Sequence, residues 1–188
     1  MNVASSLAVA VAERVERTGG PRAGLVAWKT LAGNSADGEI RGKALLAALR
    51  CAVALREDGA IGELITLWGN VDRGVWDVSI AVLCKEMTRA GLLRRATELA
   101  RAEAERHRTA LSLYVHARCL DVAGDEAAAG AFRSVVDRAV KEGAKDIALA
   151  ARVRRATLLA RSWDTMSEAL EEATQVDIAA APPESKLA

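Results

Sequence analysis

The chain has 188 residues, the size of one ordinary domain, and a formal net charge of +1 from 26 Lys or Arg and 25 Asp or Glu. Alanine is abundant and only 3% of the residues are aromatic, a composition that favours helices, excludes an all-β sandwich or barrel and makes any sheet unexpected. With 51% hydrophobic residues the chain is not disordered as a whole, and its balanced charge argues against a nucleic-acid partner, because duplex-binding domains carry a basic excess.

Glycines and capping residues divide the chain into about ten predicted helices. Proline occurs only at positions 21, 182 and 183, so most helix ends must come from glycine and from Asp or Asn caps. The predicted helices cover residues 3–18, 22–32, 38–57, 60–69, 75–89, 92–106, 109–123, 125–142, 145–162 and 165–176. We expect one helical domain over residues 1–177 and a flexible tail over residues 178–188.

The apolar N-terminus is predicted to be the first helix and not a secretory leader. No Lys or Arg precedes the apolar residues 1–12, and the charged residues 13–17 continue the pattern as an amphipathic helix. No run reaches the roughly 18 apolar residues that a membrane span needs. Three widely spaced cysteines, Cys51, Cys84 and Cys119, suit thiols in a reducing compartment. We therefore expect a cytoplasmic protein without a membrane partner.

Three glycines, Gly59, Gly91 and Gly124, mark an internal repeat with gaps of 32 and 33 residues. In this register, apolar side chains recur on one face of each helix, and small ones recur seven positions before each glycine. The recurring residues are Ala48, Ile80 and Leu113; Ala52, Cys84 and Ala117; Leu55, Met87 and Leu120; Leu64, Ala96 and Ala129; and Leu67, Leu99 and Phe132. One helix pair cannot bury its apolar face alone, so the repeat predicts stacked helix pairs, with a generic helical bundle as the alternative.

Residues 80–96 and 113–129 resemble the tetratricopeptide repeat, with a large–small–large series on the first helix, a Gly at the turn and an Ala on the second helix. The resemblance implies an all-α solenoid of about five antiparallel helix-turn-helix units, clearest over residues 45–142. It also implies a non-catalytic adaptor or regulator that binds a partner protein in a concave groove lined by the first helices. The chain departs from the family pattern, because most first-helix aromatics and the closing prolines are missing.

A weaker likeness links the same segments to the pentatricopeptide repeat, a family of RNA readers. In that family a polar residue near the start of the first helix reads a base. Val82 and Val115 stand at those positions here, and a valine side chain cannot form a hydrogen bond with a base edge. Base reading of this kind is therefore not expected.

The resemblance places five partner-binding candidates on the first helices. These residues are Arg56, Lys85, Arg89, Tyr114 and Arg118. Arg and Lys bind carboxylates, so the basic members favour an acidic peptide or a chain terminus as the partner.

The four tryptophans fall into two predicted classes. Trp28 and Trp68 occupy matching second-helix positions and are predicted to pack between repeats. Trp76 and Trp163 stand near predicted helix starts and are predicted to contact a partner.

Three other functions stay open. Residues 85–118 hold eight Lys or Arg and four Glu, which leaves single-stranded RNA binding as an alternative. His116 and Cys119 are three apart on one helix face, which leaves an all-α enzyme as another alternative. The third alternative is self-association, because the ends of a stack of repeats leave apolar faces uncovered. No second pair of metal ligands and no phosphate-binding glycine loop is present, so neither a metal nor a cofactor is predicted.

Overall fold

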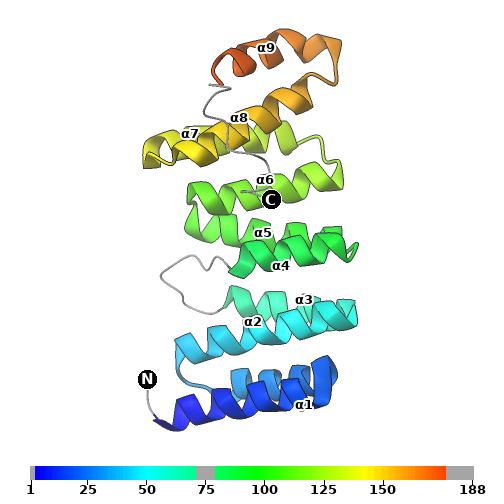
Figure 1. Ribbon diagram of the computed structural model, residues 1–188, viewed down its shortest axis with the longest axis vertical. Helices are drawn as coiled ribbons and strands as arrows, with labels where there is room; N and C mark the ends of the chain where they lie inside the picture. The colour runs from blue at the N-terminus through cyan, green and yellow to red at the C-terminus, as the bar shows by residue number, and fades with distance from the viewer. Residues whose placement is uncertain (1–2, 71–78, 177–188) are drawn as a thin grey trace. The chain divides into compact units, whose positions relative to one another are not determined.

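The computed structural model describes residues 3–70 and 79–176, and every regular element in these two ranges is a helix. The all-α class predicted from composition is thus confirmed for the described part of the chain. The elements, in order, are α1 (Val3–Asn34), α2 (Gly38–Leu55), α3 (Asp58–Gly69), α4 (Ser79–Arg89), α5 (Leu93–His107), α6 (Ala110–Ala123), α7 (Ala128–Glu142), α8 (Lys145–Leu159), the short 3-10 helix η1 (Trp163–Thr165) and α9 (Met166–Thr174) (Figure 1).

Helix α1 contains both of the first two predicted helices as the arms of a hairpin. Gly20 has non-helical backbone angles (φ 72°, ψ −174°) and is followed by Pro21, so the helix breaks there. The indole Nε1 of Trp28 donates a 2.7 Å hydrogen bond to Oε2 of Glu16. Residues twelve apart on a straight helix are separated by about 18 Å, so this bond requires the chain to fold back on itself.

The other predicted helices agree with α2 to α9 to within a few residues at each end. The start of the predicted helix 75–89, including Trp76, lies outside the described residues, as does the predicted tail 178–188.

The chain divides into two compact units, Met1–Glu98 and Leu99–Ala188, which we call unit 1 and unit 2. In unit 1, both α1 and α3 pack against α2, whose buried face includes Leu45 and Leu49, each no more than 1% exposed. Trp68 of α3 is 1% exposed and Trp28 is 3% exposed, which confirms their predicted burial.

Unit 2 has its own core between α6, α7 and α8. Tyr114 and Phe132 pack edge to face with ring centroids 5.9 Å apart, and small side chains of α6 and α8 (Ala117 and Ala151) fill the space beside them. This core holds α7 against both of its neighbours and fixes the relative positions of the side chains on their outer faces.

Left-handed residues set the register of the helix pairs. Four of them each stand eight positions before a large buried side chain; the pairs are Gly20 and Trp28, Arg56 and Leu64, Gly91 and Leu99, and Gly124 and Phe132. All four of these side chains are no more than 3% exposed. The left-handed turn closes one helix, and the eighth residue after it points into the core from the next one.

The structure corrects the predicted register at Gly59. This glycine lies in the first turn of α3, and the left-handed residue that ends α2 is Arg56, with φ 56°. The backbone N–H of Arg56 bonds to Val53 O at 3.0 Å, which closes the last turn of α2. The position equivalent to Gly91 and Gly124 is therefore Arg56, three residues before Gly59, and an arginine occupies a place that usually takes glycine.

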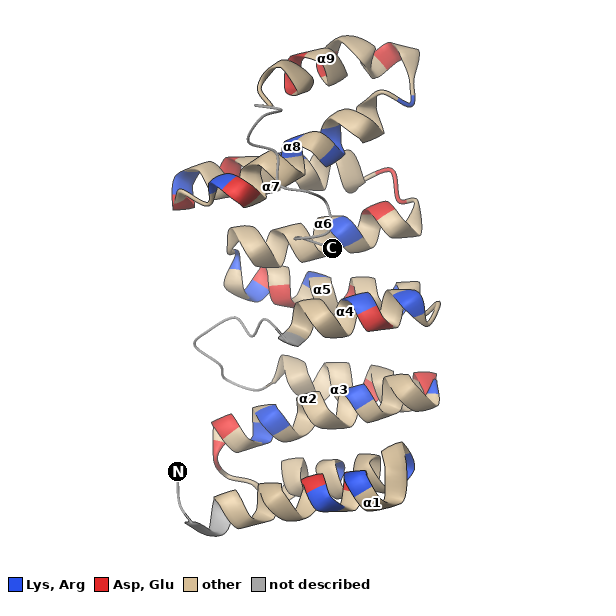
Figure 2. Ribbon diagram, viewed as in Figure 1, with Lys and Arg blue, Asp and Glu red and all other residues tan. Residues whose placement is uncertain are grey.

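Helix α9 is held on α8 by a buried arginine. Arg155 is 6% exposed, and its guanidinium pairs with the carboxylates of both Glu168 and Glu172. Arg152, one turn earlier on α8, also pairs with Glu172, at 3.3 Å. Figure 2 shows the same division of charge, with basic residues on α8 and acidic residues on α9.

Within residues 3–70 and 79–176, none of the helices combines the length and the apolar character that crossing a bilayer requires.

Alanine substitution should have opposite effects on stability at Gly124, which is left-handed, and at Gly130, which is helical. Gly124 has φ 71°, and no atom lies within 4 Å of the position that an added Cβ would take, so Gly124→Ala should cost about 1 kcal/mol through backbone strain alone. Gly130 lies inside α7 in equally open space, so Gly130→Ala should stabilise by about 0.5–1 kcal/mol. Urea unfolding of both variants measures the two effects, and a stabilising Gly124→Ala would contradict the left-handed assignment.

The buried arginine predicts local opening of α9. Arg155→Met removes the guanidinium that pairs with both carboxylates, so Glu168 loses its partner and Glu172 keeps only its contact with Arg152. Breaking a buried ion pair from one side costs up to about 3 kcal/mol, and the exposure of Glu168 reduces its share. Hydrogen exchange should show amides of α9 losing protection while those of α6 and α7 keep theirs. Arg161→Met, at an exposed position, is the control. Unchanged protection of α9 in Arg155→Met would show that this cluster does not hold the helix.

Candidate functional site

The predicted basic residues of unit 1 are all on its surface. Arg56 is the left-handed residue after α2, and Lys85 and Arg89 lie on α4; all three are exposed. Arg118, the fourth basic candidate, belongs to unit 2. Its Nη1 lies 3.8 Å from Oδ2 of Asp121. The four thus divide between two units, each with its own set of basic side chains.

The two described aromatic candidates have different environments. Tyr114 is 6% exposed and packs against Phe132, so the structure corrects its predicted groove-lining position to one in the core of unit 2. Trp163, in η1, is 89% exposed, as its position near a predicted helix start suggested. Trp76 lies outside the described residues.

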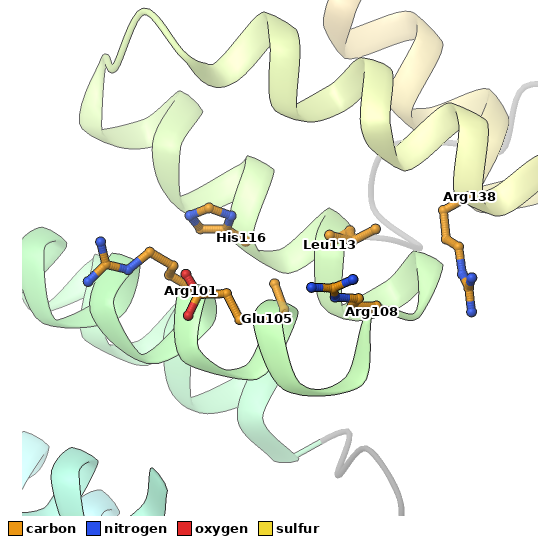
Figure 3. Close-up of a pocket in the computed structure, with 7 residues that line it drawn as sticks. Arg101, Glu105, Arg108, Leu113, His116 and Arg138 are labelled. Atoms are coloured by element: carbon orange, nitrogen blue, oxygen red, sulfur yellow. The ribbon is translucent and has the colours of Figure 1, made fainter.

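Unit 2 contains a pocket of about 410 Å³ between the C-terminal half of α5, α6 and α7 (Figure 3). Three of the residues that line it are arginines. The pocket is lined by Arg101, Ala104, Glu105, Arg108, Leu113, His116 and Arg138. Figure 3 shows Arg101 and Glu105 of α5 near His116 of α6 at one end, with Arg108 beside Leu113 towards the other. Most of these residues come from α5, α7 and the α5–α6 turn, so the pocket differs from the first-helix groove that the resemblance implied.

One of the three arginines is engaged in holding the fold. Arg138 Nε donates a 2.5 Å hydrogen bond to Glu142 Oε1, and the other oxygen of Glu142 accepts the backbone N–H of Ala110 at 2.9 Å. The Ala110 N–H and the Arg138 charge together hold the pKa of Glu142 below its usual range. Glu142 therefore remains charged, fixes Arg138 at the edge of the pocket and caps the N-terminus of α6.

The other two arginines are available to a ligand. Arg101 and Arg108 are exposed, and within the described part of the chain neither side chain forms a hydrogen bond or an ion pair. Glu105 is the single acidic residue among those that line the pocket. With His116 neutral, the lining residues carry a net positive charge, which favours an anionic ligand.

His116 is half-buried, and its chemistry is set by this environment. Burial lowers the pKa of the His116 imidazole below its usual range, and the positive charge of Arg101 lowers it further, against smaller opposing effects of Glu105 and Asp125. The imidazole is therefore neutral at pH 7 and can donate or accept one hydrogen bond. Cys119 is 6% exposed and is not among the residues that line the pocket, so the pocket presents His116 without the thiol that the enzyme alternative requires.

Across residues 3–70 and 79–176, no three His, Cys, Asp or Glu side chains gather in the way a metal ion requires. The three cysteines are buried thiols.

The sequence pointed to part of this pocket but not to the pocket itself. Arg101, Arg108 and His116 fall in the basic region 85–118, whose excess charge is visible in the sequence. Arg138 is one helix further along the chain, and only the packing of α7 beside α6 brings it to the same cavity. No local motif marks the three arginines as a set.

The comparisons with known proteins bear on the fold. No family model matches the chain, and no curated protein matches its sequence. Among solved structures, the chain is similar to MamA 41-end from Desulfovibrio magneticus RS-1, with a TM-score of 0.53 and 17% identity over 93% of this chain and 94% of that one. The chain has a tetratricopeptide-like all-α fold. The weaker pentatricopeptide likeness gains no support from these comparisons.

The position of Arg101 beside His116 predicts a change in titration. Arg101→Gln removes a positive charge that opposes protonation, so the pKa of His116 should rise towards its usual value. An NMR titration of the His116 ring protons measures it. Arg133→Gln removes an exposed arginine of α7 outside the pocket and should leave the pKa as it is in the unchanged protein. Equal pKa values in all three proteins would contradict the electrostatic contact.

Proposed function

We propose that this chain is a non-catalytic protein-interaction module, an adaptor or regulator, that binds an acidic segment of a partner protein. The observation that carries the proposal is the arginine pocket of unit 2. Two exposed guanidiniums without partners in the described structure line a cavity whose third arginine is held in place by Glu142. Guanidinium groups bind carboxylates through paired, charge-assisted hydrogen bonds.

The fold supports an interaction role in a second way. Tetratricopeptide-like helix pairs bury their apolar faces against their neighbours and leave polar outer surfaces for binding. In unit 2 the core side chains Tyr114 and Phe132 are buried, whereas the charged ones of the pocket are exposed. Trp163, at 89% exposed, is a further candidate for partner contact because exposed tryptophans are enriched among residues that dominate binding energy.

The proposal predicts arginine-dependent binding of an acidic peptide. A fluorescein-labelled hexaglutamate peptide should bind more tightly than hexalysine, and Arg101→Gln combined with Arg108→Gln should weaken hexaglutamate binding at least tenfold. The loss corresponds to one or two charge-assisted hydrogen bonds of about 1.5–3 kcal/mol each. Fluorescence anisotropy at constant salt measures the affinities.

Two double variants serve as controls with the same change in charge. Arg133→Gln with Arg161→Gln removes two exposed arginines of unit 2 outside the pocket, and its affinity should fall much less. Arg89→Gln with Arg118→Gln tests the basic residues proposed from the sequence, and we expect a smaller loss than for the pocket pair. Equal losses in all three variants would reject the pocket as the binding site. Tighter binding of a polyuridine oligonucleotide than of hexaglutamate would favour the RNA alternative.

A further inference from the structure

We propose that His116 couples ligand binding in the arginine pocket to proton uptake, so that the pocket holds an acidic segment more tightly as the pH falls below neutral. This inference rests on the proposed function, because it concerns the regulation of that same site. Three features of unit 2 carry it: the position of His116 in the wall of the pocket, the charged groups around its ring, and the effect that a bound carboxylate has on them.

His116 is the residue of the pocket that can change its charge near neutral pH. It lines the cavity from α6, with Arg101 and Glu105 of α5 beside it (Figure 3). Of the residue types that line the pocket, arginine titrates far above the range from pH 5 to 8 and glutamate titrates below it, whereas histidine titrates within it. A change of charge in the pocket within this range is therefore a change at His116.

Charged groups surround His116 from several elements. They are Arg101 and Glu105 of α5, Arg108 of the α5–α6 turn, Asp125 of the α6–α7 turn, Arg138 and Glu142 of α7, and Arg118 and Asp121 of α6 itself. Glu142 compensates the charge of Arg138, and Asp121 compensates that of Arg118. In the described part of the chain, α8 also packs against α6 but contributes none of the residues that line the pocket.

A ligand carboxylate shifts this balance in one direction. In the free chain, burial lowers the pKa of His116, and the charge of Arg101 lowers it further, against the smaller effect of Glu105. A carboxylate that pairs with Arg101 offsets this positive charge and brings a negative charge close to the ring. Both changes stabilise the imidazolium, so the pKa of His116 is higher in the complex than in the free chain.

Proton binding and ligand binding strengthen each other at such a site. Because the complex holds the proton more tightly than the free chain, binding of an acidic segment moves part of a proton from the buffer to the imidazole of His116. The affinity rises as the pH falls through the pKa of the complex, and it levels off below the pKa of the free chain. A difference of one unit between the two pKa values corresponds to about a tenfold change in Kd.

Hexaglutamate binding at two pH values tests the coupling. For the unchanged chain, Kd should be lower at pH 5.5 than at pH 8.0 by about threefold or more. His116→Gln, which is neutral at both pH values, should lose this dependence, and any change that remains reports titration of the peptide itself. His116→Lys carries a positive charge at both, so it should bind at pH 8.0 about as tightly as the unchanged chain binds at pH 5.5. Circular dichroism at each pH confirms that the variants are folded.

Two measurements follow the proton directly. An NMR titration of the unchanged chain should give a pKa for His116 that is about half a unit or more higher with saturating hexaglutamate than without it. His107, which pairs with Glu103 at 3.5 Å and does not line the pocket, is the internal control, and its ring protons should titrate alike in both samples. Isothermal titration at pH 6 in two buffers of different ionisation enthalpy should show net proton uptake for the unchanged chain and none for His116→Gln.

The outcomes separate this inference from the proposed function. The same pKa of His116 with and without the peptide, or the same pH dependence of Kd in the unchanged chain and in His116→Gln, would overturn the coupling. If the coupling fails while hexaglutamate still requires Arg101 and Arg108 at pH 7, the proposed function stands without it. If hexaglutamate binds the variant that lacks both arginines as tightly as the unchanged chain, both fail.

Discussion

The fold depends on one constraint: each helix has an apolar face that only the neighbouring helix can cover. The chain must therefore reverse direction between packed helices, and it does so at short turns closed by left-handed residues. The distance from the turn to the next buried side chain is constant at four of these reversals, from Gly20 and Trp28 to Gly124 and Phe132. The positions of these turns therefore determine which polar side chains come together on the outer surface of the helices.

Charges in this chain have two different uses. Some tie helices to one another: Arg155 joins α8 to α9, Glu16 joins the two arms of α1 through Trp28, and Glu142 joins the end of α7 to the start of α6. Others are left without a partner in the described structure, and in unit 2 two of these line one cavity. Removing one partner of a contact of the first kind costs most stability where water is excluded, as at Arg155. Charged side chains of the second kind remain available to bind a ligand.

The sequence was sufficient for the helical architecture because helix-forming composition and glycine spacing act locally. It located the ends of most helices to within a few residues and identified Trp28 and Trp68 as buried. It failed at Gly59, because an arginine in a left-handed turn leaves no signal in a search for glycines.

The candidate site was less accessible from the sequence, for a geometric reason. The register position of Tyr114 on a first helix predicts a place in a groove, but which side of that helix is covered depends on how closely α7 and α8 approach. The pocket likewise joins residues from three helices, and Arg138 is 30 positions away from Arg108 along the chain. Neither periodicity nor charge counting contains the packing distances that bring such residues together.

The left-handed arginines have a consequence for engineering this chain. Replacing a left-handed non-glycine residue by glycine relieves backbone strain, and Arg56 and Arg108 are the described positions where this applies. A thermostability screen without a binding assay would therefore favour the loss of Arg108. The substitution that the turn itself prefers removes one of the two guanidiniums on which the proposed binding of an acidic segment rests.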